Sequence, residues 1–312
     1  MPVERREVLG HLAAVTCILF WGMAFVSTKI LLQDFTPVEI LFFRFVLGYA
    51  ALLIIYPHRL QTRNLREECF LVAAGICGIT IYFLLENVAL AYTFASNASV
   101  LIATAPLFTA ILAHLLLQGE RLRGRFLVGF FVAIIGISLI TFNGSFILKL
   151  NPLGDFLAIS AAAVWASYSV LMRKISEFGY NAIGSTRRVF MYGLIFILPA
   201  FFFFEHQLDF SRFAKLINLF NILFLGLGSS ALCFVLWNWA IGVLGAVKTS
   251  FYIYASPVIT VIASALVLRE SITPIACIGI LLTLAGLYVS EQNRKEEPDS
   301  ANRHHKSGHV SP

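Results

Sequence analysis

Apolar residues gather in ten long runs along the chain, and short polar segments separate each run from the next. We place the runs at residues 12–32, 37–57, 70–92, 98–117, 126–142, 154–172, 183–204, 217–240, 248–268 and 275–290. Within each run the apolar positions are nearly continuous and do not follow the spacing of an amphipathic helix. A helix needs roughly 20 such residues to cross a bilayer. The pattern predicts an all-α polytopic membrane protein with ten transmembrane helices.

Composition supports a location in a lipid bilayer. The 312 residues are 59% hydrophobic and 13% charged, and the mean hydropathy is +0.83. Soluble domains carry about 25% charged residues, so this chain has too few charged residues to cover a water-facing surface. The five cysteines lie in or beside apolar runs without a CxxC pair, which predicts neither a disulfide nor a metal site. We expect no cofactor.

Loop charges orient the predicted helices. With a cytoplasmic N-terminus, the inner segments hold fourteen basic residues: Arg5, Arg6, Arg59, Arg63, Arg66, Arg121, Arg123, Arg125, Arg173, Lys174, Arg294, Lys295, Arg303 and Lys306. The outer segments hold four: Lys149, Arg212, Lys215 and Arg269. The positive-inside rule therefore places both termini in the cytoplasm, with residues 1–11 and 291–312 inside and 143–153 as an external linker. The net charge of +6 follows from this loop distribution and does not indicate a nucleic-acid partner.

The two halves of the chain repeat each other. Residues recur at an offset of 144 in the first two helices of each half, 151 in the next two and 150 in the last. The recurring pairs include Trp21 and Trp165, Lys29 and Arg173, Arg44 and Arg188, Asn87 and Asn238, Pro106 and Pro257, and Gly136 and Gly286. Each half, at 12–142 and 154–290, holds five predicted helices, so the second enters the membrane from the opposite side. Such inverted repeats are typical of transporters that alternate access around a site near the midplane.

Several segments resemble one known family. The stretches FWGMAFVSTKIL and PVEILFFRFVLGYAALLI resemble the first two helices of the EamA-like family of the drug/metabolite transporter superfamily. SVLIATAPLFTAILAHLLLQGERL and TSFYIYASPVITVIASALVLRESI resemble its fourth and ninth helices. The resemblance covers residues 12 to about 290. It implies ten helices around a central cavity and transport of small metabolites, often amino-acid export, here across a bacterial cytoplasmic membrane.

Polar and conformational features inside the spans are candidates for function. Pro106 and Pro257 each remove a backbone donor in mid-span, which indicates either a hinge beside the cavity or a tolerated kink, and we favour the hinge. Glu86 interrupts the third run, and an ionisable group there costs about 2.5–3.5 kcal/mol on insertion scales. It is a candidate for holding a substrate ammonium or relaying a proton, and the alternative is an ion pair with Arg44 or Lys29.

Five cations lie within or at the edges of the predicted helices, and for one of them, Arg187, snorkelling to water is favoured. Arg44 lies too deep to be an interfacial anchor, and an ion pair that locks the outer helix ends is favoured over contact with a substrate carboxylate. Arg188, Lys29 and Lys248 lie nearer the helix ends, where snorkelling to water is the alternative to a gate or ion pair.

Aromatic and amide side chains provide candidates for the cavity wall, because small-molecule sites are mostly apolar with a few polar groups. The candidates are Trp21, Phe25, Asn87, Trp165, Tyr168, Asn238 and Tyr252, and the alternative for each is ordinary packing. Small residues on one face of the fifth and tenth helices, including Gly136 and Gly286, indicate a scaffold contact or a homodimer contact.

Other functional classes receive less support from the sequence. No HExxH motif, paired aspartates or phosphate loop is present, so an enzyme and an ATP-driven pump are disfavoured. A non-transporting scaffold would not explain mirrored prolines and buried charge. A channel is a further alternative, because the fold alone does not determine the function. We predict a secondary transporter that exports amino acids or related metabolites, coupled to a proton or a counter-substrate. A sugar-phosphate or nucleotide-sugar exchanger is the alternative.

Overall fold

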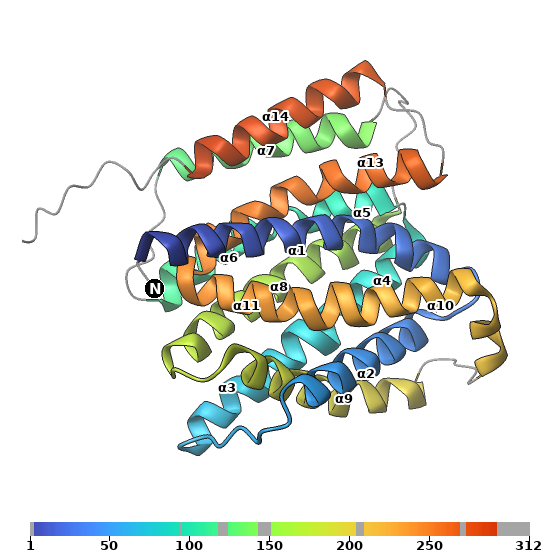
Figure 1. The fold of residues 1–312 in the computed structure, drawn as a ribbon. Helices are drawn as coiled ribbons and strands as arrows, with labels where there is room; N and C mark the ends of the chain where they lie inside the picture. The colour runs from blue at the N-terminus through green and yellow to red at the C-terminus, as the bar shows by residue number, and fades with distance from the viewer. Residues whose placement is uncertain are drawn as a thin grey trace, which may run out of the picture.

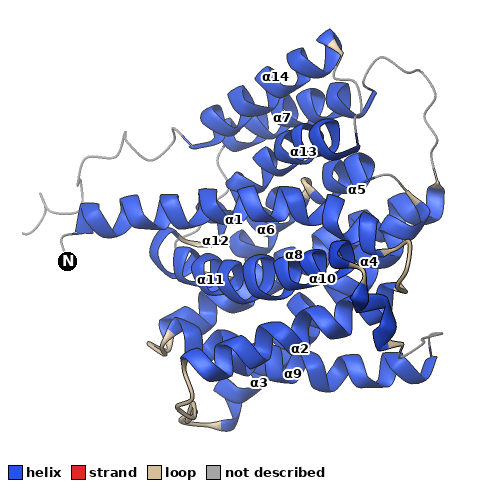
Figure 2. Ribbon diagram, turned by 45° about the vertical axis from the view of Figure 1, so that its right-hand side comes forward, coloured by secondary structure: helices blue, strands red, loops and turns tan. Residues whose placement is uncertain are grey.

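The computed structural model describes residues 3–93, 95–117, 124–142, 151–203, 209–268 and 273–291. Helices joined by short turns make up these residues, and Figure 1 and Figure 2 show them as a bundle of long rods. The α-helices are α1 (Val3–Leu31), α2 (Pro37–Ile55), α3 (Leu65–Gly75), α4 (Tyr82–Tyr92), α5 (Ala95–Ile102), α6 (Ala105–Leu116), α7 (Gly124–Phe142), α8 (Pro152–Glu177), α9 (Ala182–Phe203), α10 (Leu216–Leu223), α11 (Cys233–Leu244), α12 (Ala246–Ser250), α13 (Ser256–Leu268) and α14 (Pro274–Glu291). Two π-helices, η1 (Ile76–Ile81) and η3 (Phe224–Leu232), and two 3₁₀ helices, η2 (Phe210–Ala214) and η4 (Phe251–Ala255), complete the order.

Several of these elements join end to end, and every predicted span overlaps one helical run. Elements α3, η1 and α4 form one run over Leu65–Tyr92, and α10, η3 and α11 form another over Leu216–Leu244. Within the described residues, seven helical runs are long and apolar enough to cross a membrane. That all ten predicted runs cross it stays a prediction. The external linker falls mostly, and the cytoplasmic tail almost wholly, outside the described residues.

Local sequence explains where the helices begin. The Thr36 hydroxyl accepts from the amide of Glu39, and the Glu39 carboxylate accepts from the Thr36 amide, which forms a capping box ahead of Pro37. Asn64 and Asn151 cap α3 and α8 in the same manner through their side-chain oxygens. Helix α1 begins at Val3, earlier than the predicted residue 12, so most of the predicted N-terminal segment is helical.

Irregular turns occupy equivalent places in the two halves. The π-helix at residues 76–81 corresponds, at the offset of 151, to residues 227–232 inside the second π-helix. The break between α5 and α6 at residues 103–104 corresponds likewise to 254–255 at the end of η4. The repeat therefore extends from side-chain identity to backbone conformation.

Helices α7 and α14 lie side by side at one edge of the bundle, away from α2, α3 and α9 (Figures 1 and 2). Their small residues face each other. A β-carbon at Gly136 would lie 2.5 Å from the backbone nitrogen of Thr283, and one at Gly286 would lie 2.5 Å from that of Ala133. The small-residue faces are thus used in a contact within the chain, which is the scaffold alternative of the sequence prediction.

Candidate functional site

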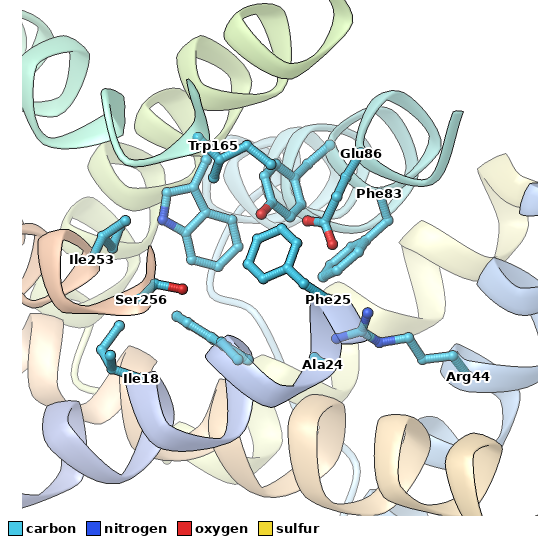
Figure 3. Close-up of a pocket in the computed structure, with 12 residues that line it drawn as sticks. Ile18, Ala24, Phe25, Arg44, Phe83, Glu86, Trp165, Ile253 and Ser256 are labelled. Atoms are coloured by element: carbon cyan, nitrogen blue, oxygen red, sulfur yellow. The ribbon is translucent and has the colours of Figure 1, made fainter. Parts of the chain in front are cut away.

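A cavity lies in the middle of the bundle between elements of both halves (Figure 3). Its walls come from α1, α2, α4 and α5 of the first half and from α8, η4 and α13 of the second. The lining residues are Ile18, Trp21, Ala24, Phe25, Arg44, Tyr82, Phe83, Glu86, Ile102, Trp165, Ile253 and Ser256. The space not filled by atoms is about 460 Å³, including the open mouth. The lining is mostly apolar, as in small-molecule sites generally.

Two broken helices approach the cavity from opposite halves. The first break follows Ile102, and Pro106 is then the second residue of α6. In the other half, Pro257 is the second residue of α13, directly after the 3₁₀ turn that contains Ile253. Each proline therefore begins a new helix segment, where its missing N–H is tolerated, and does not kink a continuous helix. Whether the breaks act as hinges stays a prediction.

The aromatic wall joins the two halves directly. The rings of Trp21 and Trp165 meet edge to face with centroids 5.2 Å apart, and Tyr82 lies 4.8 Å from Trp165. Trp21 is held in place because its Nε1 donates to the carbonyl oxygen of Ser229 at 2.9 Å. Such pairs contribute roughly 0.5–1.5 kcal/mol beyond burial of their area. The two tryptophans, which are related by the repeat, thus form a fixed part of the cavity wall.

One side of the cavity is charged. Arg44 is 1% exposed and Glu86 is 4% exposed, and Figure 3 shows both side chains turned toward the space beside Phe25 and Phe83. The Glu86 carboxylate lies near the Tyr82 hydroxyl, and it attracts Arg44 electrostatically without a direct ion pair between them. The guanidinium carbon of Arg44 lies 4.2 Å from the centroid of the Phe83 ring. The site therefore presents one cation and one anion within an apolar enclosure.

The charged side has no counterpart in the second half. Trp237 stands at the position equivalent to Glu86, is fully buried and lies 4.7 Å from the ring of Trp21. Among the described lining residues, the carboxylate of the cavity therefore comes from the first half alone.

Three predicted wall residues, Asn87, Tyr168 and Asn238, are not among the residues that line this cavity. The Asn87 amide nitrogen donates to the carbonyl oxygen of Pro37 at 3.0 Å. In the second half, the Tyr168 hydroxyl donates to Oδ1 of Asn238 at 2.7 Å, and Nδ2 of Asn238 donates to the Thr186 hydroxyl at 2.9 Å. These contacts tie helices together beside the cavity and do not face into it.

The remaining candidates also lie away from the cavity. Tyr252 bonds through its hydroxyl with His11 near the start of α1. Lys29 donates to two backbone carbonyls and is not ion-paired with Glu86. Arg188 forms an ion pair with Glu68, N to O, at 2.8 Å, and Lys248 is half-buried in α12.

Comparison with known proteins places the chain in a family. A model of the EamA-like transporter family matches residues 8–142 and 152–291. The chain belongs to the EamA-like transporter family. An "Uncharacterized transporter" of Archaeoglobus fulgidus is 29% identical over 90% of this chain and 96% of its own length. The "Probable terminal-alkyne amino-acid exporter" of Streptantibioticus cattleyicolor is 25% identical over 88% and 91%.

A solved crystal structure supports the same fold. It aligns with this chain at a TM-score of 0.68 and 20% identity, over 90% of this chain and 96% of its own. With the family match, the long apolar helices identify an integral membrane protein. Among the described residues of this EamA-like chain, no group of three or more His, Cys, Asp or Glu side chains is placed to hold a metal ion.

Sequence reasoning missed four polar or aromatic residues of this EamA-like site. Tyr82 precedes Glu86 by four positions, so helical spacing alone would have placed the two on one face. Phe83 and Ser256 carry no comparable signal, because apolar and small residues surround them in their helices. Ser229, which holds Trp21, lies 208 residues away in sequence and offers no local sign of the contact.

Proposed function

We propose that this EamA-like protein is a secondary transporter, not an enzyme, that exports amino acids or related small metabolites by alternating access. The observation that carries the proposal is the meeting of Trp21 and Trp165 at a cavity built from both halves. A site between two repeats is positioned to open first to one side and then to the other as the halves rock.

The charges in the cavity favour a zwitterion. Arg44 is suited to a carboxylate and Glu86 to an ammonium, and Trp21, Phe25 and Trp165 provide an apolar surface for the rest of the molecule. The related Streptantibioticus protein, named as a probable amino-acid exporter, supports the same substrate class. Sugar phosphates and nucleotide sugars are disfavoured, because Arg44 is the single cation among the described lining residues and a carboxylate lies beside it.

Transport itself is tested by counterflow in liposomes that hold the purified full chain. We expect a labelled amino acid to exchange against the same unlabelled compound, and Trp21→Ala, Trp165→Ala and Glu86→Gln to reduce the rate at least tenfold. Trp239→Ala and Glu177→Gln are matched controls, because neither residue lines the cavity. If all three cavity variants inserted normally and kept the full rate, the proposed site would be abandoned.

The driving force is tested in the same vesicles. A pH gradient that accelerates net flux would support a coupling proton, and stimulation only by trans substrate would support a counter-substrate.

The proposed orientation places both termini on the cytoplasmic side of a bacterial cytoplasmic membrane. It predicts that a reporter that works only in the cytoplasm is active when it is fused to either terminus. An active external reporter at either end would contradict that topology.

A further inference from the structure

Two adjacent serines fix the buried guanidinium of Arg44. Its Nε donates to the hydroxyl of Ser230 at 2.6 Å, and its Nη2 donates to the hydroxyl of Ser229 at 2.9 Å. The ring of Phe83 covers one face of the guanidinium. Because serine hydroxyls are neutral, these contacts hold the side chain in place without neutralising its charge.

One nitrogen of the guanidinium is left over. Nη1 of Arg44 has no hydrogen-bond partner, although the residue is almost completely buried and lines the cavity. A buried donor without a partner is unfavourable, and more so when it is charged. No ion pair joins Arg44 to Glu86, although the two charges attract each other across the cavity lining. The structure thus holds an unpaired, charged donor at the cavity wall.

The backbone of the second half explains why the serines reach Arg44. Ser229 and Ser230 lie in the π-helix η3, whose widened turn disturbs the regular ladder of backbone bonds. The carbonyl of Ser229 accepts the bond from Trp21, so one turn positions both the cation and an indole of the cavity. Close approach is permitted by Gly226, where a β-carbon would lie 2.7 Å from the β-carbon of Leu47.

We propose that Nη1 of Arg44 binds a carboxylate of the transported molecule, and that Ser229 and Ser230 are positioning residues for this contact. The inference deepens the proposed function and rests on it, since it names the substrate group that the first half of the cavity recognises. A carboxylate is favoured over a phosphate as the bound group. The Glu86 carboxylate would repel a doubly charged phosphate more strongly than it would repel a singly charged carboxylate. The two bonds to serine fix the plane of the guanidinium, so the free nitrogen meets the ligand without further ordering.

Binding is tested on the detergent-purified full chain with matched probes. The panel holds leucine, methionine and phenylalanine, their carboxamides, and the carboxylates hexanoate and 3-phenylpropionate with the corresponding amides. Thermal unfolding midpoints against probe concentration give an apparent Kd for each compound. We expect the wild-type protein to bind acids ten- to a hundredfold more tightly than amides, as a charge-assisted bond worth about 1.5–3 kcal/mol requires.

The variants separate binding, positioning and folding. Arg44→Gln should abolish the preference for acids, and Ser229→Ala with Ser230→Ala should reduce it severalfold. Ser138→Ala is the control, because its hydroxyl bonds only within α7 to the carbonyl oxygen of Ile134. A purely structural role for the serines would lower the midpoint without changing the ratio of acid to amide affinity. Should Arg44→Gln fail to insert, the ratio in the wild type and in Arg44→Lys decides.

Each outcome bears on a different conclusion. A wild-type protein that treats acids and amides alike, or responds to the panel no differently from Arg44→Gln, would overturn the carboxylate contact. An unchanged ratio in the double serine variant would overturn the positioning role. If counterflow moves amino acids and their amides equally, the proposed transport function stands and this inference fails. If counterflow moves neither, the proposed function fails first.

Discussion

Lys29 and Arg173 make the same kind of contact at opposite ends of the bundle. Nζ of Lys29 donates to the carbonyl oxygens of Leu90 at 2.6 Å and Thr93 at 3.0 Å. Nη1 of Arg173 donates to the carbonyl oxygen of Gly242 at 3.0 Å. Each cation therefore lies against the C-terminal end of a helix, where exposed carbonyls and the helix dipole favour positive charge. The positions are related by the offset of 144.

These two contacts tie different helix pairs together. Lys29 joins α1 to α4 at the end predicted to be external, whereas Arg173 joins α8 to α11 at the end predicted to be cytoplasmic. In an alternating-access cycle, loosening one end favours the state that is open on that side. We therefore expect Lys29→Met and Arg173→Met to shift the conformational equilibrium in opposite directions, each by about fivefold for a contact worth about 1 kcal/mol.

The shift is measured with a single cysteine at the cavity wall, Ala24→Cys, after the five native cysteines have been replaced. A membrane-impermeant maleimide added outside should label this position faster in the Lys29→Met background and more slowly in the Arg173→Met background. Lys174→Met is the control, since Lys174 pairs only with its neighbour Glu177. Changes in the same direction for both variants would show that the contacts serve stability alone.

A second cationic contact secures the predicted external end. Arg212 binds the fully buried carboxylate of Glu39 through two bonds of 2.9 and 3.0 Å. Arg212→Met leaves that carboxylate without this partner, and we expect a loss of about 2–3 kcal/mol, below the usual 3–5 because Arg212 is partly exposed. Lys215→Met breaks the exposed pair with Asp34 and should cost much less, because water screens exposed charges. Thermal midpoints in detergent compare the two variants, and equal losses would contradict this ranking.

The same cluster, at the end predicted to be external, predicts a pH effect on stability. Bonds from Lys215 and Asn218 hold the pKa of Asp34 below its usual range, and the charge of Arg212 acts in the same direction. A depressed carboxyl pKa contributes stability above the ordinary value of about 4, and that stability is lost as the pH falls through the folded value. Midpoints between pH 6 and pH 3 should therefore drop more steeply for the wild type than for Asp34→Asn. Parallel curves would show that Asp34 does not contribute.

Hydropathy and the repeat predicted the parts of the architecture that depend on length and periodicity. The ten apolar runs coincide with helical runs, and the shared offset anticipated that Trp21 and Trp165 occupy equivalent places. The facing direction of polar residues was harder to predict. In a helix that is apolar on every face, the sequence pattern does not show which face lines the cavity. It therefore could not predict that Glu86 lines the cavity whereas Asn87 and Asn238 do not.

Contacts between segments that are distant in the chain could not be predicted from the sequence. The π-helical turn that brings Ser229 and Ser230 to Arg44 depends on packing between α2 and η3, which no local pattern announces. Lys29 illustrates the same limit, because a cation near a helix end is compatible with water, an ion pair or a neighbouring helix terminus. The structure selects the last of these three.

The contact between α7 and α14 gives the final prediction. Gly136 and Gly286 each leave no room for a β-carbon, since one would lie 2.5 Å from backbone nitrogen of the other helix. Alanine at either position forces the helices apart, and we expect a loss of about 1–3 kcal/mol in stability. Gly124→Ala is the matched control, because a β-carbon at Gly124 meets nothing within 4 Å.

Thermal midpoints and light scattering on the same detergent samples separate the two interpretations of this small-residue face. A contact within the chain predicts that Gly136→Ala and Gly286→Ala lower the midpoint at every protein concentration and leave the mass of the particle unchanged. A contact between two copies predicts the opposite result for these variants. The particle would become smaller, and the midpoint would change only with protein concentration. That second result would mean that α7 and α14 exchange their partners between copies, and the intramolecular packing described above would have to be given up.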